Sequence, residues 1–287
     1  MSVLKCRSLA KPALSVANVL GMTVALMLIP AADALSQREF RGGRRSFGGD
    51  PNEFYVPPDW GGNVPYDGRV TFVRIKYRGY YSFGREGPGW SHDYPRAEEH
   101  FMRIIREITS IRPFVESAKT IGSNIFALDD PELMKYPVAY LSEPGGWYPN
   151  EKEVLGLRNY LLKGGFVIVD DFDEGRDGAE LQHFLSVMQQ VLPKGQAKEV
   201  AETHPIFDAF FKLDRSSLAG GGPNDYGRAR YLAFHQDNNP NKRILMMVNL
   251  NLDIGEYWQW SDQGFNPVPS NEAYKLGVNY LIYALTH

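Results

Sequence analysis

The sequence predicts an α/β protein with a three-layer, doubly wound and mainly parallel sheet. Short apolar, β-branched runs alternate with longer amphipathic segments along the chain, which is the pattern of parallel strands joined by crossover helices. The amphipathic segments carry apolar residues at i, i+3, i+4 and i+7, as helices that cover a sheet do. About 250 residues remain after an N-terminal leader, enough for one sizeable α/β core.

The first predicted strand is Val70–Tyr77, a β-branched run. A loop rich in glycine and aromatic residues follows, and a helix is expected to begin at Pro95, because proline suits the first helical position. Glu98 and Glu99 lie in its first turn, and its apolar face comprises Phe101, Ile104, Ile105 and Ile108. Two short strands are predicted near residues 114–115 and 125–128.

The middle of the chain contains a second strand–helix–strand unit. Pro137–Ser142 reads as a buried strand, and the helix after it opens with a capping box formed by Asn150 and Glu153. Gly164 supplies the left-handed helix stop, so residues 166–170 form the next strand directly. The remaining predicted elements are a helix at 177–191, strands at 230–236 and 243–249, and a closing helix at 270–287.

Three regions are expected along the chain. Residues 1–34 have the features of a cleavable signal peptide, namely a basic start, an apolar stretch at 19–29 and the small-residue site Ala32-Asp33-Ala34. This predicts an exported, periplasmic protein; the alternative is an uncleaved segment that anchors it to the inner membrane. Residues 35–68 read as a flexible Arg/Gly/Pro-rich arm, and residues 69–287 as one α/β domain.

Composition excludes several classes of function. The formal charge is −3, and removal of the leader takes away three basic residues and one acid, which leaves −5. An acidic chain gives no support for nucleic-acid binding. The single cysteine, Cys6, lies in the leader, so the mature chain has no disulfide, no thiolate zinc site and no cysteine nucleophile.

Candidate site residues lie where the predicted parallel strands end. In open α/β sheets, ligands bind beyond the carboxyl ends of the strands, so the loops after residues 77, 142 and 170 are expected to form one crevice. The candidate catalytic residues are Asp170, Asp171 and His204, because carboxylates and imidazole can serve as general acids and bases. The candidate ligand-binding residues are Tyr77, Trp90, Glu143, Trp147 and Asp173.

Each candidate also has a simpler structural interpretation. Asp171, Asp173 and Glu174 follow a strand and precede a helix, where acids commonly cap the helix or lie in solvent. Asp170 directly ends the apolar run and is expected to be more deeply buried than the acids after it. The catalytic and the structural interpretations fit Asp170 equally well. His204 precedes Pro205 and either extends into the crevice or belongs to a packed loop.

No metal or cofactor is expected from the motifs. The loop that starts at Asp171 has acids at the first, third and seventh positions of a calcium loop, but Gly175 is one place too early and Gln182 replaces the final glutamate. The histidines have no HExxH spacing, and neither a serine elbow nor a phosphate-binding glycine loop occurs.

Four pieces of the sequence resemble the bacterial family called domain of unknown function 4159. They occur in the family's order, and the resemblance covers residues 70–287: FVRIKYRG, DPELMKYPVAYLSEPGGWYPNEKEVLGLRNYLLKGGFVIVDDFD, ETHPIF and LGVNYLIYALT.

The resemblance implies a flavodoxin-like fold similar to class I glutamine amidotransferases. In those enzymes a cysteine occupies the strand-to-helix elbow, where this chain has Asp170 and Asp171. Glutaminase chemistry is therefore excluded, and fold alone does not supply another activity. Some family members are joined to membrane proteins of the aerotolerance type, which implies a role in cell-envelope assemblies.

Three hypotheses of function follow. The first is a non-catalytic module that binds a small polar ligand such as a carbohydrate in the crevice. The second is a structural or interaction protein with an envelope partner, in contact with the membrane only if the leader is retained. The third is a metal-assisted hydrolase that uses Asp170, Asp171 and His204.

Overall fold

The structure, a computed structural model, describes residue 57 and residues 60–79, 87–117, 120–218 and 227–287. The predicted leader and most of the predicted arm lie outside these residues. None of the helices within the described ranges is both long and apolar enough to cross a membrane.

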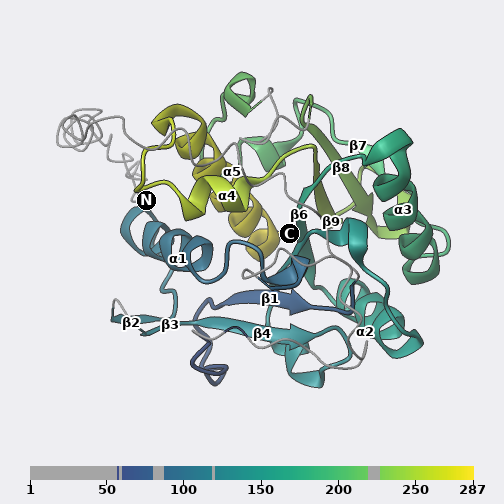
Figure 1. Cartoon of the computed structure of the whole chain (residues 1–287), viewed down its shortest axis with the longest axis horizontal. Helices are drawn as coiled ribbons and strands as arrows, with labels where there is room; N and C mark the ends of the chain where they lie inside the picture. Colours follow the sequence, from purple (N-terminus) through teal and green to yellow (C-terminus); the bar gives the residue numbers. More distant parts are fainter. Residues whose placement is uncertain (1–56, 58–59, 80–86, 118–119, 219–226) are drawn as a thin grey trace, which may run out of the picture. The chain divides into compact units, whose positions relative to one another are not determined.

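A seven-stranded sheet forms the centre of the described structure, in the order β4-β1-β5-β6-β9-β8-β7 (Figure 1). The first five strands of this order are parallel, whereas β8 and β7 are antiparallel to their neighbours. The predicted α/β class and mainly parallel sheet are therefore confirmed. The strands are β1 Phe72–Lys76, β4 Ser123–Ala127, β5 Val138–Ser142, β6 Phe166–Phe172, β7 Lys198–Glu199, β8 Arg230–His235 and β9 Ile244–Leu250; a separate hairpin pairs β2 Val115–Ser117 with β3 Thr120–Ile121.

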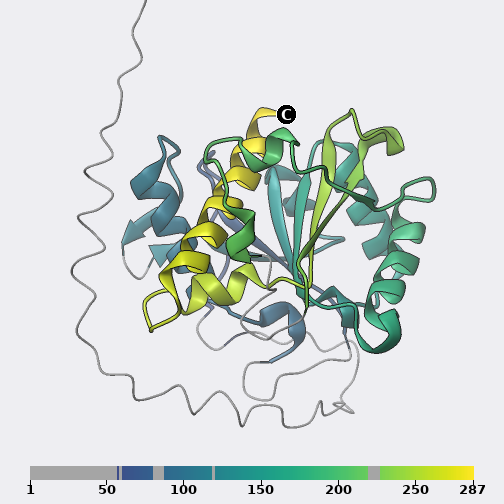
Figure 2. The same cartoon turned by 90° about the horizontal axis from the view of Figure 1, so that it is seen from above.

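Helices cover both faces of the sheet (Figure 2). On one face lie α1 Arg96–Ile108, α4 Ile254–Gln259 and α5 Pro267–Thr286; on the other lie α2 Glu151–Leu162 and α3 Ala179–Val191. Short 3-10 helices occupy the connections: Gly89–Ser91, Pro131–Lys135, Pro144–Gly146, Arg176–Gly178, Pro205–Phe207, Arg215–Leu218 and Gln236–Asn238.

The alternation of side chains along β6 divides the core in two. Val167 and Val169 pack with α2 and α3, whereas Phe166 and Ile168 pack with α1, α4 and α5. Successive strand residues point to opposite faces, so a continuous apolar run is what a strand buried on both sides needs.

One helix, α4, is not among the helices predicted from the sequence. Asp253 starts this helix, because its side chain accepts a hydrogen bond from the backbone N–H of Glu256. Tyr257 and Trp258 are buried, so they pack on their own domain and are not available to a ligand.

The strand order places a switch point between β1 and β5. Numbered along the chain, the five parallel strands run 2-1-3-4-5, and the chain leaves β1 and β5 toward helices on opposite faces. A crevice forms where neighbouring strands connect in opposite directions. Here the two loops touch: Gly79 bridges Trp147, and a Cβ on Gly89 would lie 2.9 Å from that of Glu143.

The last residues of the predicted arm lie against the edge strand β4. The side chain of Asn63 bonds to the backbone of Ile125, and the side chain of Asn124 bonds to the backbone of Val64. These contacts satisfy backbone groups at a sheet edge that would otherwise be unpaired.

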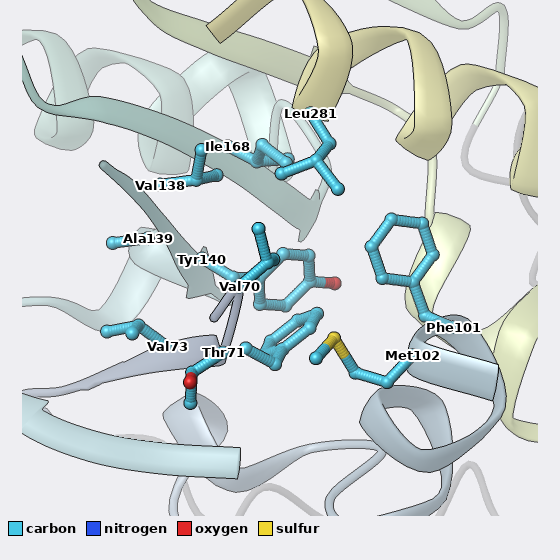
Figure 3. Close-up of a pocket in the computed structure, with 11 residues that line it drawn as sticks. Val70, Thr71, Val73, Phe101, Met102, Val138, Ala139, Tyr140, Ile168 and Leu281 are labelled. Atoms are coloured by element: carbon cyan, nitrogen blue, oxygen red, sulfur yellow. The ribbon is translucent and has the colours of Figure 1, made fainter. Parts of the chain in front are cut away.

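A small apolar cavity of about 30 Å³ lies between the beginnings of β1 and β5 and the helices α1 and α5 (Figure 3). Phe101, Met102, Ile168 and Leu281 are among its lining residues. The space is about that of one water molecule, far below the size of a ligand pocket, so we assign it no binding role.

A fully buried ion pair holds the loop after β1 in place. Arg74 of β1 donates from Nε to Glu98 of α1, and its Nη1 donates to the carbonyl oxygens of Trp90 (2.9 Å) and His92 (2.8 Å). Its guanidinium also lies 5.0 Å from the ring centre of Tyr140. Arg74 therefore joins a helix, a strand and the loop next to the switch point.

Removal of one partner of this pair should be costly. We expect Glu98→Gln to lower the free energy of unfolding by about 3–5 kcal/mol, because it leaves the Arg74 charge buried without its carboxylate. Glu99→Gln is the matched control: its contact with Arg103 is a third exposed at each end, so its loss should cost under about 0.5 kcal/mol. Urea unfolding measures both, and equal costs would contradict this role of Arg74.

Candidate functional site

The end of β6 is irregular, and this irregularity arranges Asp170 and Asp171. The pairing of β6 with β9 shifts register between Val169 and Phe172, and Asp171 has a left-handed backbone conformation with φ of 58°. Such bulges re-aim side chains at the rims of sheets. Neither residue caps the following helix or lies in solvent; both are completely buried.

Asp170 holds the start of α4. Its Oδ2 accepts hydrogen bonds from the Tyr140 hydroxyl (2.7 Å) and from the backbone N–H groups of Ile254 and Gly255 (2.9 and 3.1 Å). Its Oδ1 accepts from the side chain of Asn249 at 2.9 Å. Burial raises the pKa of Asp170 to about 7, although these donors act to lower it.

Asp171 forms an ion pair with His92. His92 Nδ1 lies 2.6 Å from Asp171 Oδ2, and the Ser142 hydroxyl lies 3.4 Å from the same oxygen. Burial opposes the charge on both groups, but the carboxylates of Asp93 and Asp171 raise the pKa of His92 well above its usual value. In return, His92 lowers the pKa of Asp171. The pair is therefore charged at neutral pH.

Two further aspartates complete the cluster. Asp93 comes from the loop after β1, and Asp253 from the residue that begins α4. His92, Asp93, Asp171 and Asp253 each offer one ligand atom, and these atoms all lie within 4.8 Å of one another. Imidazole and carboxylate groups gathered in this way can hold a cation.

Several carboxylate oxygens of the cluster have no hydrogen-bond donor. Among the described residues, no N–H or hydroxyl group donates to either oxygen of Asp93, to Oδ1 of Asp171 or to Oδ2 of Asp253, so only a protonated neighbouring carboxyl group can do so. The carboxyl groups instead face one another, Asp93 with Glu256 and Asp171 with Asp253. Buried acceptors are normally satisfied, so these oxygens call for an explanation.

Crowded carboxyl groups keep protons that they would lose in water. Burial raises the pKa of Asp93 to about 6 and that of Glu256 to about 8, and neighbouring carboxylates add to the rise for Glu256. Burial, with the charges of Asp171 and Asp93, raises the pKa of Asp253 well above its usual value. One imidazolium faces four carboxyl groups here, so protons supply the remaining neutralisation.

The sequence-predicted residues Tyr77 and Glu143 lie beside this cluster as supports. The Tyr77 hydroxyl is buried and within hydrogen-bonding distance of the carbonyl oxygens of Ser142 (2.9 Å) and Glu143 (2.5 Å). Glu143 has a left-handed backbone conformation and is buried. They shape the end of β5, where the crevice was expected.

The other ligand-binding candidates do not face a ligand. Trp90 and Trp147 are fully buried core residues, so neither presents a ring on which a sugar can stack. Asp173 accepts a hydrogen bond from the backbone N–H of Gly175, which is the local turn contact that acids commonly make after a strand. The two tryptophan rings therefore serve the core.

His204 lies far from Asp170 and Asp171. Its ring packs 6.5 Å from that of His235, whose strand partner is Ile244 at the beginning of β9, whereas the cluster lies where β9 ends. Seven strand residues separate these ends by about 20 Å. His204 accepts from the N–H of Ile206 and caps a 3-10 helix. The predicted trio of Asp170, Asp171 and His204 does not form.

Sequence reasoning missed His92, Asp93 and Asp253. His92 and Asp93 lie in the loop after β1, and the histidines of the sequence show no metal-binding spacing that would single them out. Asp253 lies before a helix that the sequence prediction does not contain. A signal was nevertheless present: all three follow predicted strands, at the edge where the carboxyl ends of parallel strands meet.

Together, the fold and the site define a mixed α/β domain with a buried acidic centre at the carboxyl ends of its parallel strands. The chain belongs to the family described as domain of unknown function (DUF4159), whose model matches residues 71–285. A comparison with curated proteins gave no match.

The raised pKa values predict an unusual dependence of stability on pH. Between about pH 5 and 8, the folded protein holds protons on Asp93, Asp170 and Glu256 that the unfolded chain has lost, and His92 acts in the same sense above pH 6.5. The free energy of unfolding should therefore fall as pH rises through this window.

Two histidines oppose this trend. Burial lowers the pKa of His204 and His235, so their contribution makes the fold less stable below about pH 6.5. We expect the carboxyl groups to dominate, with a net loss above about 1.4 kcal/mol, equivalent to one pKa unit. Urea unfolding in the presence of a chelator measures it, and stability that rises from pH 5 to 8 would contradict the assignment.

Proposed function

We propose that this domain is a binding module for a cationic ligand, which it holds at the acidic centre formed by His92, Asp93, Asp171 and Asp253. The observation that carries the proposal is the set of buried carboxylate oxygens that receive no hydrogen bond from an N–H or hydroxyl group. A polar group buried without a partner costs about 1–3 kcal/mol, and more if it is charged. A protein keeps such a cost where the groups serve a ligand.

The balance of charge supports a cation over an anion or a neutral ligand. Arg74 is paired with Glu98, and Asp170 has four donors, so neither contributes spare positive or negative charge. His92 is left opposite three aspartates and the partly exposed Glu256. A bound cation would replace the protons that these acids hold.

A cation is a more specific ligand than the small polar molecule expected from the sequence. Three of the tryptophans on which a carbohydrate could stack, Trp90, Trp147 and Trp258, are buried. A hydrolase that uses His204 lacks the geometry, since His204 lies at the other end of β9. The strand order 2-1-3-4-5 supports the amidotransferase-like, flavodoxin-like architecture that we propose for the domain.

Export to the periplasm is part of the same proposal. Its support is the leader-like composition of residues 1–34. A binding module in the periplasm is exposed to cations from outside the cell. An envelope partner is consistent with the Arg/Gly/Pro-rich composition of residues 35–56.

Cations should stabilise the protein specifically. We expect at least one member of a panel of divalent metal chlorides and small organic ammonium salts to raise the melting temperature by about 5–10 °C at a hundredfold excess over its Kd. Sodium chloride at matched ionic strength is the reference. Differential scanning fluorimetry measures the shift.

Two variants that each remove one negative charge test whether the shift in melting temperature arises at the acidic centre. Asp253→Asn should abolish the shift, and its Oδ1 can still accept from the N–H of Glu256, so the helix cap survives. Asp173→Asn, on the loop after β6, should leave the shift unchanged. No cation effect beyond ionic strength, or equal loss in both variants, would overturn the proposal.

A further inference from the structure

We infer that the cation is a divalent transition-metal ion, coordinated directly by His92, Asp93, Asp171 and Asp253. The inference rests on the proposed function and specifies its ligand. It extends beyond the sequence motifs, which predict no metal, because these ligands come from three separate segments of the chain.

The spacing of the four groups fits one ion. Metal bonds to histidine and carboxylate are about 2.0–2.2 Å long, so two ligands on opposite sides of an ion lie about 4.2 Å apart. The four ligand atoms already lie within 4.8 Å of one another. Adjustments below about 1 Å, within the range of side-chain rotation, would close the shell.

Unpartnered oxygens point independently to a ligand. The side chains of Asp93 and Asp171 have no exposed surface, and Asp253 is equally buried. Within the part of the chain that the structure describes, both oxygens of Asp93 and one each of Asp171 and Asp253 receive no hydrogen bond from an N–H or hydroxyl group and have only other carboxyl groups as neighbours. A metal ion satisfies several carboxylate oxygens at once, which a single proton cannot do.

The type of donor indicates the type of metal. Calcium and magnesium prefer shells made only of oxygen, whereas imidazole favours zinc, iron, nickel and other transition ions. One imidazole with three carboxylates and no thiolate therefore suits a borderline divalent ion such as zinc, cobalt or iron. Calcium and magnesium should bind much more weakly, because His92 offers them little.

Neighbouring residues hold the proposed metal ligands in position, as is usual around a metal site. Arg74 holds the carbonyl of His92, and Asp170 holds the backbone of Ile254, next to Asp253. Gly255 leaves room for Asp93: a Cβ at position 255 would lie 2.5 Å from Asp93 Oδ2. Groups that orient metal ligands typically change affinity by 10–100-fold when they are lost.

Access to the centre lies on the side of His92. Its side chain is 14% exposed, whereas the three aspartates are buried. Glu256, which faces Asp93, is also partly exposed. An ion could therefore enter from this side, and water or a further ligand could complete its shell there.

Cobalt provides a direct test. The full-length chain, treated with a chelator and dialysed, is titrated with CoCl₂ while the visible absorption of the ion is recorded, and zinc is then added in competition. We expect one equivalent of cobalt to bind with d–d bands shifted from those of the hydrated ion, and zinc to displace it. Calcium and magnesium at a hundredfold excess should not.

Three variants identify the ligands. Asp93→Asn should weaken cobalt binding by more than about 100-fold without lowering the melting temperature of the metal-free protein, because it removes one of several buried carboxyl groups that face one another. His92→Gln should reduce the preference for cobalt over calcium at least tenfold. Asp173→Asn is the matched control and should bind as the wild type does.

The outcomes separate this inference from the proposed function. Stabilisation by organic ammonium ions alone, or by calcium and magnesium as strongly as by cobalt, would overturn the transition-metal site while a cation site remained. Cobalt bound equally by wild type and Asp93→Asn would overturn the ligand assignment. The absence of any cation effect would overturn both.

Discussion

Buried negative charge at the carboxyl ends of the parallel strands must be neutralised for this fold to form. The fold gathers Asp93, Asp171 and Asp253 within reach of one another and places a single imidazolium, His92, among them. Carboxylates this close cannot all be ionised without compensation, so the metal-free protein retains protons on several of them. A cation would provide the same compensation without those protons. The centre is thus held at a cost in stability that binding would recover.

Two buried residues of the sheet, Arg74 and Asp170, hold the backbone segments that carry the residues of the cluster. Arg74, buried in β1, binds backbone carbonyls of the loop that carries His92 and Asp93, and Glu98 neutralises it. Asp170 does the same for the start of α4 through two backbone N–H groups. Both oxygens of Asp170 accept hydrogen bonds from N–H or hydroxyl groups, in contrast to the oxygens of the cluster itself. This contrast distinguishes Asp170, which positions the site, from the residues that would bind.

The sequence predicted the strands and helices of this protein better than its acidic centre. Periodicity and caps located five parallel strands and four of the helices, because these elements are determined by local apolar patterns and short-range hydrogen bonds. The rule that ligands bind at the carboxyl ends of strands directed attention to Asp171, but local statistics favoured a solvated or capping role that proved wrong. Burial of Asp171 comes from a bulge and a left-handed residue in β6, and its partner His92 is 79 positions away. Neither feature has a local signature, and the position of Asp253 depends on a helix of six residues that follows β9.

The free energy of unfolding of wild type and Asp93→Asn, measured with and without cobalt, shows whether the acidic centre is a cation site. If the centre is a cation site held at a cost, cobalt should stabilise the wild type strongly and the variant little, and the metal-free variant should be at least as stable as the metal-free wild type. A variant that is less stable without metal, and equally stabilised by it, would mean that Asp93 is structural and that the cluster has another purpose.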